Sequence, residues 1–199
     1  MTILEAVRHY LALVVLVSFV PLLAFWFLIH PFVGLWRRLG PGIAYGAASA
    51  IMIVIGAGIF ALRGPLLAVE FGTVPLLWPP AALAYLAAIV LEVLCRRQLS
   101  IGTLIGLPEL VPSRVPGRLL TEGIYARVRH PRYTGGGLGL LALACFTNYL
   151  AVYLLFAAYL PTIYAITVFE ERELAERFGA AYARYRQHVP RFLPGRPKR

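Results

Sequence analysis

Five apolar stretches dominate this sequence, and most are close to the length that an α-helix needs to cross a lipid bilayer. A bilayer core about 30 Å thick takes about 20 helical residues. The stretches cover residues 11–29, 43–62, 74–95, 133–146 and 149–169. Because an unpaired backbone amide or carbonyl is costly in lipid, such stretches are expected to be helical. The sequence therefore predicts an all-α, polytopic membrane protein with about five transmembrane helices.

Composition favours a membrane protein over a nucleic-acid binder. Hydrophobic residues make up 60% of the chain and charged residues 14%, against roughly a quarter charged in soluble domains. The net charge is +10, but the basic residues gather at a few points instead of lining one face with interleaved aromatics. We expect membrane lipids as partners and no nucleic acid.

The positions of the basic residues predict the orientation. Short cytoplasmic loops are enriched in Lys and Arg. With five spans and a cytosolic C-terminus, 17 of the 19 basic residues fall inside: Arg37 and Arg38, seven arginines in 96–132, and eight residues in 172–199. Arg8 and Arg63 fall outside. We therefore expect the N-terminus out and the C-terminus in the cytosol, with a bacterial inner membrane as the default because no organelle signal is evident.

The chain is expected to form one domain over residues 1–199. Residues 1–95 would supply three spans, and residues 96–199 a polar region with a two-helix hairpin that turns at Thr147 and Asn148. Gly135 and Gly139 have the small-xxx-small spacing of closely packed membrane helices. The two cysteines match no metal or redox spacing, so no metal site is expected.

The first polar block leads into the fourth span. Arg129 and His130 precede Pro131, which fits the first turn of a helix because its missing N–H would be unpaired there. The amides and dipole of that helix end favour an anionic ligand group. A surface that merely meets lipid phosphates is the alternative interpretation of these residues.

The second polar block follows the fifth span. Glu170 and Glu171 lie at the hydrocarbon boundary, where a carboxylate is costly unless a cation pairs with it. Glu173 and Glu176 fit a solvated helix extension. Residues 178–186 are rich in Arg and Tyr and are expected to pack over the site and on the headgroups. Together the blocks suggest a cytosolic pocket for an anion, an ammonium and a flat base, which are the features of an adenosyl amino acid.

The order of motifs is similar to that of the isoprenylcysteine carboxyl methyltransferase family and the related phospholipid N-methyltransferases. The motifs are LLTEGIY (119–125), VRHPRYTG (128–135), EEREL (170–174), FG (178–179), YARY (182–185) and VPRFLP (189–194). The resemblance covers residues 117–194. It implies an enzyme that uses S-adenosyl-L-methionine to methylate a lipophilic acceptor entering from the bilayer, such as an isoprenylcysteine carboxylate.

The resemblance also implies which residues contact the cofactor. Glu170 would meet the methionine amino group, and the full expected set is Leu119, Leu120, Tyr125, Arg129, His130, Pro131, Tyr133, Glu170 and Glu171. Two positions depart from the family. Gly117 stands where the eukaryotic enzymes often have His, and Ile166 stands where they have an Arg suited to the substrate carboxylate.

Other acceptors and activities stay open at this point. A phospholipid amine or a small thiol could replace the prenylcysteine, and for an amine His130 or Glu171 would be the nearest candidate base. An NADPH-dependent reductase of the sterol-reductase type shares an Arg-His-Pro block, although such enzymes are usually longer. A non-enzymatic protein that binds anionic lipid is the third possibility.

Overall fold

The computed structural model describes residues 1–111 and 117–194, and the regular elements in these ranges are all helices. Arg114, Arg196, Lys198 and Arg199, which count toward the predicted cytosolic charge, lie outside the described residues. The elements are α1 (Ile3–Ile29), α2 (Val33–Leu39), α3 (Pro41–Ala61), α4 (Arg63–Leu66), η1 (Pro75–Leu77), α5 (Trp78–Arg96), α6 (Ile101–Leu104), α7 (Leu107–Leu110), η2 (Gly123–Ala126), α8 (Pro131–Thr147) and α9 (Leu150–His188).

Four helical segments in the described ranges are long and apolar enough to cross a membrane: α1, α3, Pro75–Arg96 and α9. This confirms the all-α, polytopic membrane fold. The remaining predicted span corresponds to α8, which has 17 residues and so rises about 25 Å. That α8 crosses the whole bilayer stays a prediction.

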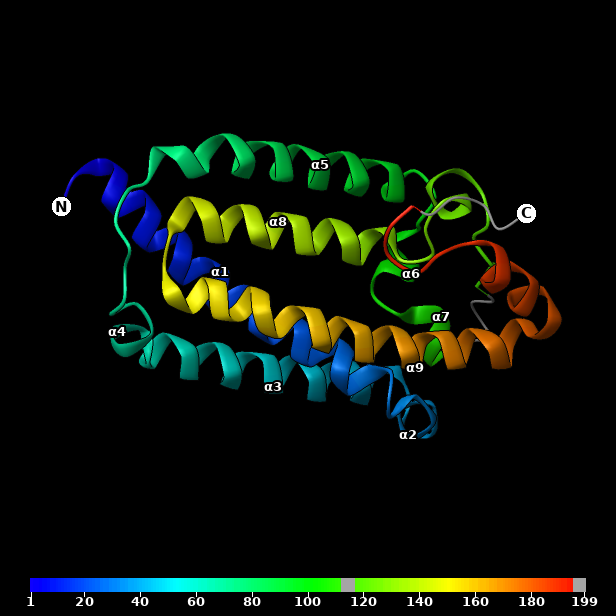
Figure 1. Cartoon of the computed structure of the whole chain (residues 1–199). Helices are drawn as coiled ribbons and strands as arrows, with labels where there is room; N and C mark the ends of the chain where they lie inside the picture. Colours follow the sequence, from blue (N-terminus) through cyan, green and yellow to red (C-terminus); the bar gives the residue numbers. More distant parts are fainter. Residues whose placement is uncertain (112–116, 195–199) are drawn as a thin grey trace.

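The long helices lie side by side (Figure 1), and the small elements gather at the two ends. The N-terminus, α4 and the α8–α9 turn lie at one end, and α2, α6, α7 and the end of α9 lie at the other. The predicted hairpin is present, because Asn148 adopts a left-handed conformation (φ 58°) and ends α8 just before α9 begins. The C-terminal polar blocks are therefore carried to the end that holds α2, α6 and α7.

Glycines on α8 let α5 pack closely against it. A Cβ atom added to Gly135 would lie 3.3 Å from the Leu91 Cβ atom, and one added to Gly139 would lie 3.6 Å from the Ala88 Cβ atom. Both neighbours belong to α5. The small-xxx-small spacing of Gly135 and Gly139 therefore marks a closely packed helix pair, as predicted.

Buried charge fastens the opposite end of the bundle. Arg8 of α1 is 1% exposed and pairs with Glu70 at 2.9 Å. Its guanidinium also donates to the carbonyl oxygens of Gly72 and Thr147. Arg8 thus connects the segment before α5 to the α8–α9 turn. This structural role is separate from any effect of Arg8 on the orientation of the protein in the membrane.

The last part of α9 turns back because the helix is broken at Gly179. Its φ of 51° and ψ of −126° lie outside the helical region. Glycine tolerates a positive φ without a Cβ clash. Figure 1 shows this part bending away from the straight run of α9, at the end where α6 and α7 lie. The break brings residues 180–192 back over the start of α8.

Packing between α5 and α8 can be tested by replacing either of two glycines with leucine. Gly135→Leu should destabilise the protein by about 1–3 kcal/mol because it overpacks a tight seam. Gly46→Leu on α3 should change little, since no atom lies within 4 Å of an added Cβ atom there. Thermal unfolding in nanodiscs measures both. Equal effects of the two substitutions would contradict this account of the seam.

Candidate functional site

A cavity of about 480 Å³ opens at the end of the bundle that carries the polar blocks. This volume is within the usual range of small-molecule and cofactor sites, about 300–1,000 Å³. Of the residues predicted to contact a cofactor, all except Glu171 line it: Leu119, Leu120, Tyr125, Arg129, His130, Pro131, Tyr133 and Glu170. The folded chain therefore brings together residues that are up to 51 positions apart in sequence, from 119 to 170.

The start of α8 is held by the C-terminal segment. Pro131 is the first residue of α8, as predicted, and His130 precedes it. The backbone amides of Arg129 and His130 donate to the carbonyl oxygens of Pro190 and Arg191, at 2.9 and 3.0 Å. Residues 190–192 thus lie across the mouth of α8 and fix the backbone on which His130 stands.

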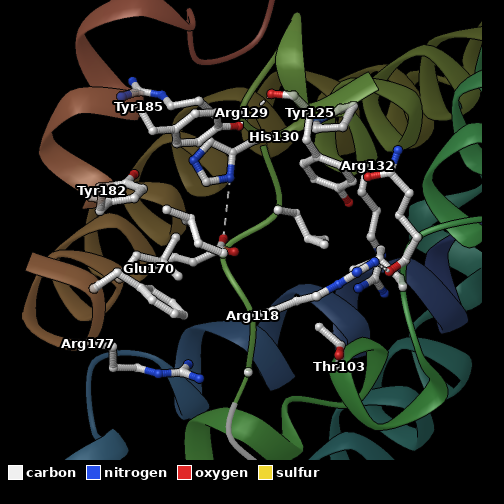
Figure 2. Close-up of a pocket in the computed structure, with 18 of the residues that line it drawn as sticks. Thr103, Arg118, Tyr125, Arg129, His130, Arg132, Glu170, Arg177, Tyr182 and Tyr185 are labelled. Carbon is white, nitrogen blue, oxygen red and sulfur yellow. Dashed lines mark hydrogen bonds and ion pairs between the residues drawn. The ribbon is translucent and has the colours of Figure 1, made fainter. Parts of the chain in front are cut away.

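Glu170 supplies the acidic side chain of the cavity wall. Its Oε2 atom lies 3.5 Å from Nδ1 of His130, as the dashed line in Figure 2 shows. This oxygen is buried and has no hydrogen-bond partner among the described residues. A buried carboxylate oxygen without a donor is costly, so the geometry suits a ligand that brings a cationic donor, such as an ammonium group.

Glu171 points away from the cavity and organises the groups around it. Its carboxylate is 3.0 Å from Nε2 of His130, 3.2 Å from the Arg129 guanidinium, and bonded through both oxygens to Arg191 at 2.9 and 2.8 Å. Glu171 is 3% exposed. It therefore positions His130 and the C-terminal segment, and the geometry favours this role over ligand contact or proton abstraction.

The Glu171–Arg191 pair joins α9 to the C-terminal segment beside the cavity. Hydrogen bonds from the Arg191 guanidinium to Glu171 raise the pKa of Arg191 above its usual value. Arg191 therefore keeps its charge, and the pair does not open through loss of that proton. The C-terminal segment is fastened by a permanent cation.

Aromatic rings form much of the remaining wall. Tyr125, Phe178, Tyr182 and Tyr185 line the cavity, and the Tyr185 hydroxyl donates to the Tyr125 carbonyl oxygen at 2.7 Å. Burial raises the pKa of the Tyr125 phenol, so this ring is neutral at physiological pH. The expectation that residues 178–186 would pack over the site is confirmed for these rings, which offer flat apolar surface to a base.

The N-terminal half contributes a wall that the motifs did not predict. Trp26 of α1 and His30, the C-cap of that helix, line the cavity, and their rings stack with centroids 5.3 Å apart. Further lining residues outside the predicted set include Gln98, Thr103, Arg118, Arg132 and Arg177. A histidine and a tryptophan at the end of an apolar span are a sequence signal for a polar site at a membrane boundary.

The interpretation of Glu173 as a solvated residue is wrong. Its carboxylate is 2.8 Å from Arg37, 3.6 Å from Arg177 and 3.7 Å from Nδ1 of His30, and the residue is 5% exposed. Burial follows because α2 folds back against this part of α9. Glu176 is exposed, as expected.

Ile166 lies in the core of the bundle and is fully buried. An arginine there would have to displace packed apolar side chains, and no cavity-lining position is available to it. The structure therefore offers no guanidinium at the place where the related eukaryotic enzymes are expected to hold a substrate carboxylate.

Comparison with known proteins decides the family. Residues 80–181, about half of the chain, match the family model described as phospholipid methyltransferase. The chain belongs to this family. The matched region contains the first-block residues and Glu170, whereas Trp26 and His30 precede it. No solved structure matches the chain.

Three curated relatives match part of the chain. A methanethiol S-methyltransferase of Bradyrhizobium diazoefficiens is 40% identical over 83 residues, or 41% of this chain and 28% of the relative. A protein-S-isoprenylcysteine O-methyltransferase of Schizosaccharomyces pombe is 38% identical over 38% of this chain and 33% of its own. A cobalt-zinc-cadmium resistance protein of Cupriavidus metallidurans is 35% identical over 42% of this chain and 39% of its own. These matches thus span about a third of each relative.

The contact between Arg191 and Glu171 can be tested by hydrogen exchange. Arg191→Gln should speed amide exchange at Arg129 and His130, because their partner carbonyl oxygens lie beside residue 191. Arg186→Gln, a change at an exposed side chain of α9, should leave both amides protected. Mass-spectrometric exchange in nanodiscs measures this difference. Unchanged protection in Arg191→Gln would show that the C-terminal segment is held by other contacts.

Proposed function

We propose that this protein is an integral membrane methyltransferase that uses S-adenosyl-L-methionine. The observation that carries the proposal is the buried Oε2 atom of Glu170, which faces a cavity lined by aromatic rings and lies in the region that matches the family. Glu170 would bind the methionine ammonium group. Tyr125, Tyr182 and Tyr185 would pack around the adenine and ribose.

The protein's own task in such a reaction is alignment and exclusion of water. The cofactor supplies an activated methyl group on a sulfonium sulfur, so no protein nucleophile is required. Fixing two reactants in line removes much of the entropic barrier. Glu170 and the aromatic wall would hold the donor, and the residues of α1 would bound the space for the acceptor.

The proposed acceptor is lipophilic, reaches the cavity from the bilayer, and carries a thiol. One relative acts, by its name, on methanethiol, which is a thiol. The protein-S-isoprenylcysteine relative is by its name an O-methyltransferase, so the thiol proposal rests on the first relative alone. Burial of Ile166 in the core disfavours the carboxylate-binding mode. A phospholipid amine is the second candidate, because the matching family model is described by phospholipid methylation. Either acceptor would be surrounded by membrane lipids before it enters the cavity.

The basic residues that line the cavity favour a cytosolic position for the site. Arg118, Arg129, Arg132 and Arg177 all lie at this end, which gives an N-terminus outside and a C-terminus in the cytosol. A bacterial inner membrane is the proposed location. A nicotinamide-dependent reductase would instead use this basic end to bind NADPH. A non-enzymatic protein would use it to bind anionic lipid.

Substitution of Glu170 separates these functions. Glu170→Gln should weaken binding of tritiated S-adenosyl-L-methionine at least tenfold, about 1.4 kcal/mol, through loss of an ammonium contact. Glu176→Gln on the exposed side of α9 is the matched control and should bind normally. Equilibrium dialysis in nanodiscs measures both. Retention of NADPH without S-adenosyl-L-methionine would establish the reductase, and full binding by Glu170→Gln would refute this site.

A further inference from the structure

His30 is a buried, titratable residue in the cavity that the proposed cofactor contacts leave without a role. It is 6% exposed and caps the C-terminal end of α1, outside the region that matches the family. Its ring stacks on Trp26 at an interplanar angle of 18°. Its position in the wall makes it a candidate to meet the second reactant.

The two histidines of the cavity have different surroundings. His130 has a carboxylate near each ring nitrogen, Glu170 at 3.5 Å from Nδ1 and Glu171 at 3.0 Å from Nε2. Its Nε2 atom is thus committed to Glu171, and its Nδ1 atom faces Glu170 without a hydrogen bond. His130, the base suggested by the motifs, is therefore poorly placed to take a proton from an acceptor.

His30 lies near a carboxylate, at a distance longer than a hydrogen bond. Its Nδ1 atom lies 3.7 Å from Glu173 Oε2, while the other oxygen of Glu173 is fixed by Arg37 at 2.8 Å. A carboxylate at this distance favours positive charge on the imidazole through space. Glu173 also pairs with Arg177 of α9, and Arg132 lies over the Trp26 ring on which His30 stacks.

His30 approaches α9 at Glu173, one helical turn after the proposed ammonium site at Glu170. His30 faces Glu173, and the cofactor ammonium is assigned to Glu170, three residues earlier. Three residues rise about 4.5 Å along a helix. In S-adenosyl-L-methionine a three-carbon chain separates the amino nitrogen from the sulfonium sulfur, which is a comparable length. His30 therefore lies near the level of the sulfonium if the cofactor runs along α9.

We infer that His30 accepts the proton of a neutral thiol acceptor. The thiol S–H proton passes to an imidazole nitrogen of His30, which leaves a thiolate. The thiolate sulfur forms a bond to the methyl carbon while the bond from that carbon to the sulfonium sulfur breaks, and its electron pair stays on the departing sulfide. His30 then releases the proton to solvent. This role rests on the proposed methyl-transfer function and adds the acceptor-side residue.

The test compares a thiol that needs a base with one that does not. Hexanethiol is protonated at neutral pH, and pentafluorothiophenol is already ionised. His30→Gln should lower kcat for hexanethiol about 100-fold or more, the usual size of a general-base contribution. Turnover of pentafluorothiophenol should stay within about threefold, because a variant that lacks only a proton acceptor keeps the other transition-state contacts. His188→Gln, an exposed histidine of α9, is the control.

The pH profile gives a second readout that a structural role would not produce. With hexanethiol, turnover by the unaltered protein should fall as pH drops through the titration range of histidine. In His30→Gln this limb should disappear, and turnover should instead rise with ionisation of the thiol itself. Glu173→Gln leaves the imidazole in place and should slow hexanethiol selectively, which covers the case in which His30→Gln does not fold.

The outcomes separate the two proposals. Equal loss with both thiols, or no loss with either, overturns the role of His30, as does failure of the unaltered protein to methylate any thiol while it binds S-adenosyl-L-methionine. Failure to bind S-adenosyl-L-methionine at all overturns the proposed function itself. A selective loss with hexanethiol, with normal cofactor binding, supports His30 as the proton acceptor.

Discussion

The cavity depends on a single buried carboxylate, that of Glu171. Three cationic or polar partners, from His130, Arg129 and Arg191, converge on it within 3.2 Å. Removing one member of such a cluster leaves charge uncompensated in a poorly solvated place, which is far more costly than losing a surface ion pair. Because one partner precedes α8 and another follows α9, Glu171 joins the two ends of the hairpin region into one wall.

This arrangement leaves Glu170, the neighbouring residue, directed into the cavity. Successive residues on a helix are about 100° apart, so two adjacent acids face different surroundings. Glu171 is bonded to protein side chains, whereas one buried oxygen of Glu170 accepts no hydrogen bond from the described residues. Of the two adjacent acids, Glu171 therefore positions the site, and Glu170 is suited to bind a ligand.

The cavity is also divided between the two halves of the chain. The C-terminal half provides Glu170, His130 and the tyrosines, within or next to the region that defines the family. The N-terminal half provides Trp26 and His30, and Arg37 of α2 pairs with Glu173 of α9, which lies near His30. Such a division would let related proteins keep one donor site while α1 adapts to different acceptors. Figure 2 shows how Glu170 and Arg118 approach the same space from different segments.

The sequence by itself determined the helices, the membrane class and the family. Apolar length fixed the long helices because lipid cannot satisfy an exposed backbone, and Pro131 marked the start of α8 because proline costs nothing there. The spacing of Gly135 and Gly139 indicated a close helix contact, and the motif order named residues that line the cavity without any coordinates. These properties are local, so short stretches of sequence suffice to read them.

Only the tertiary structure decided which polar groups meet. Nothing local distinguishes Glu173 from Glu176, yet one is buried against α2 and the other is exposed. Likewise, the pairing of Glu171 with Arg191 joins residues 20 positions apart. The contact of His30 with Glu173 joins residues more than 100 positions apart. Such pairings are set by how the helices pack and by the bend at Gly179, which no single stretch of sequence encodes.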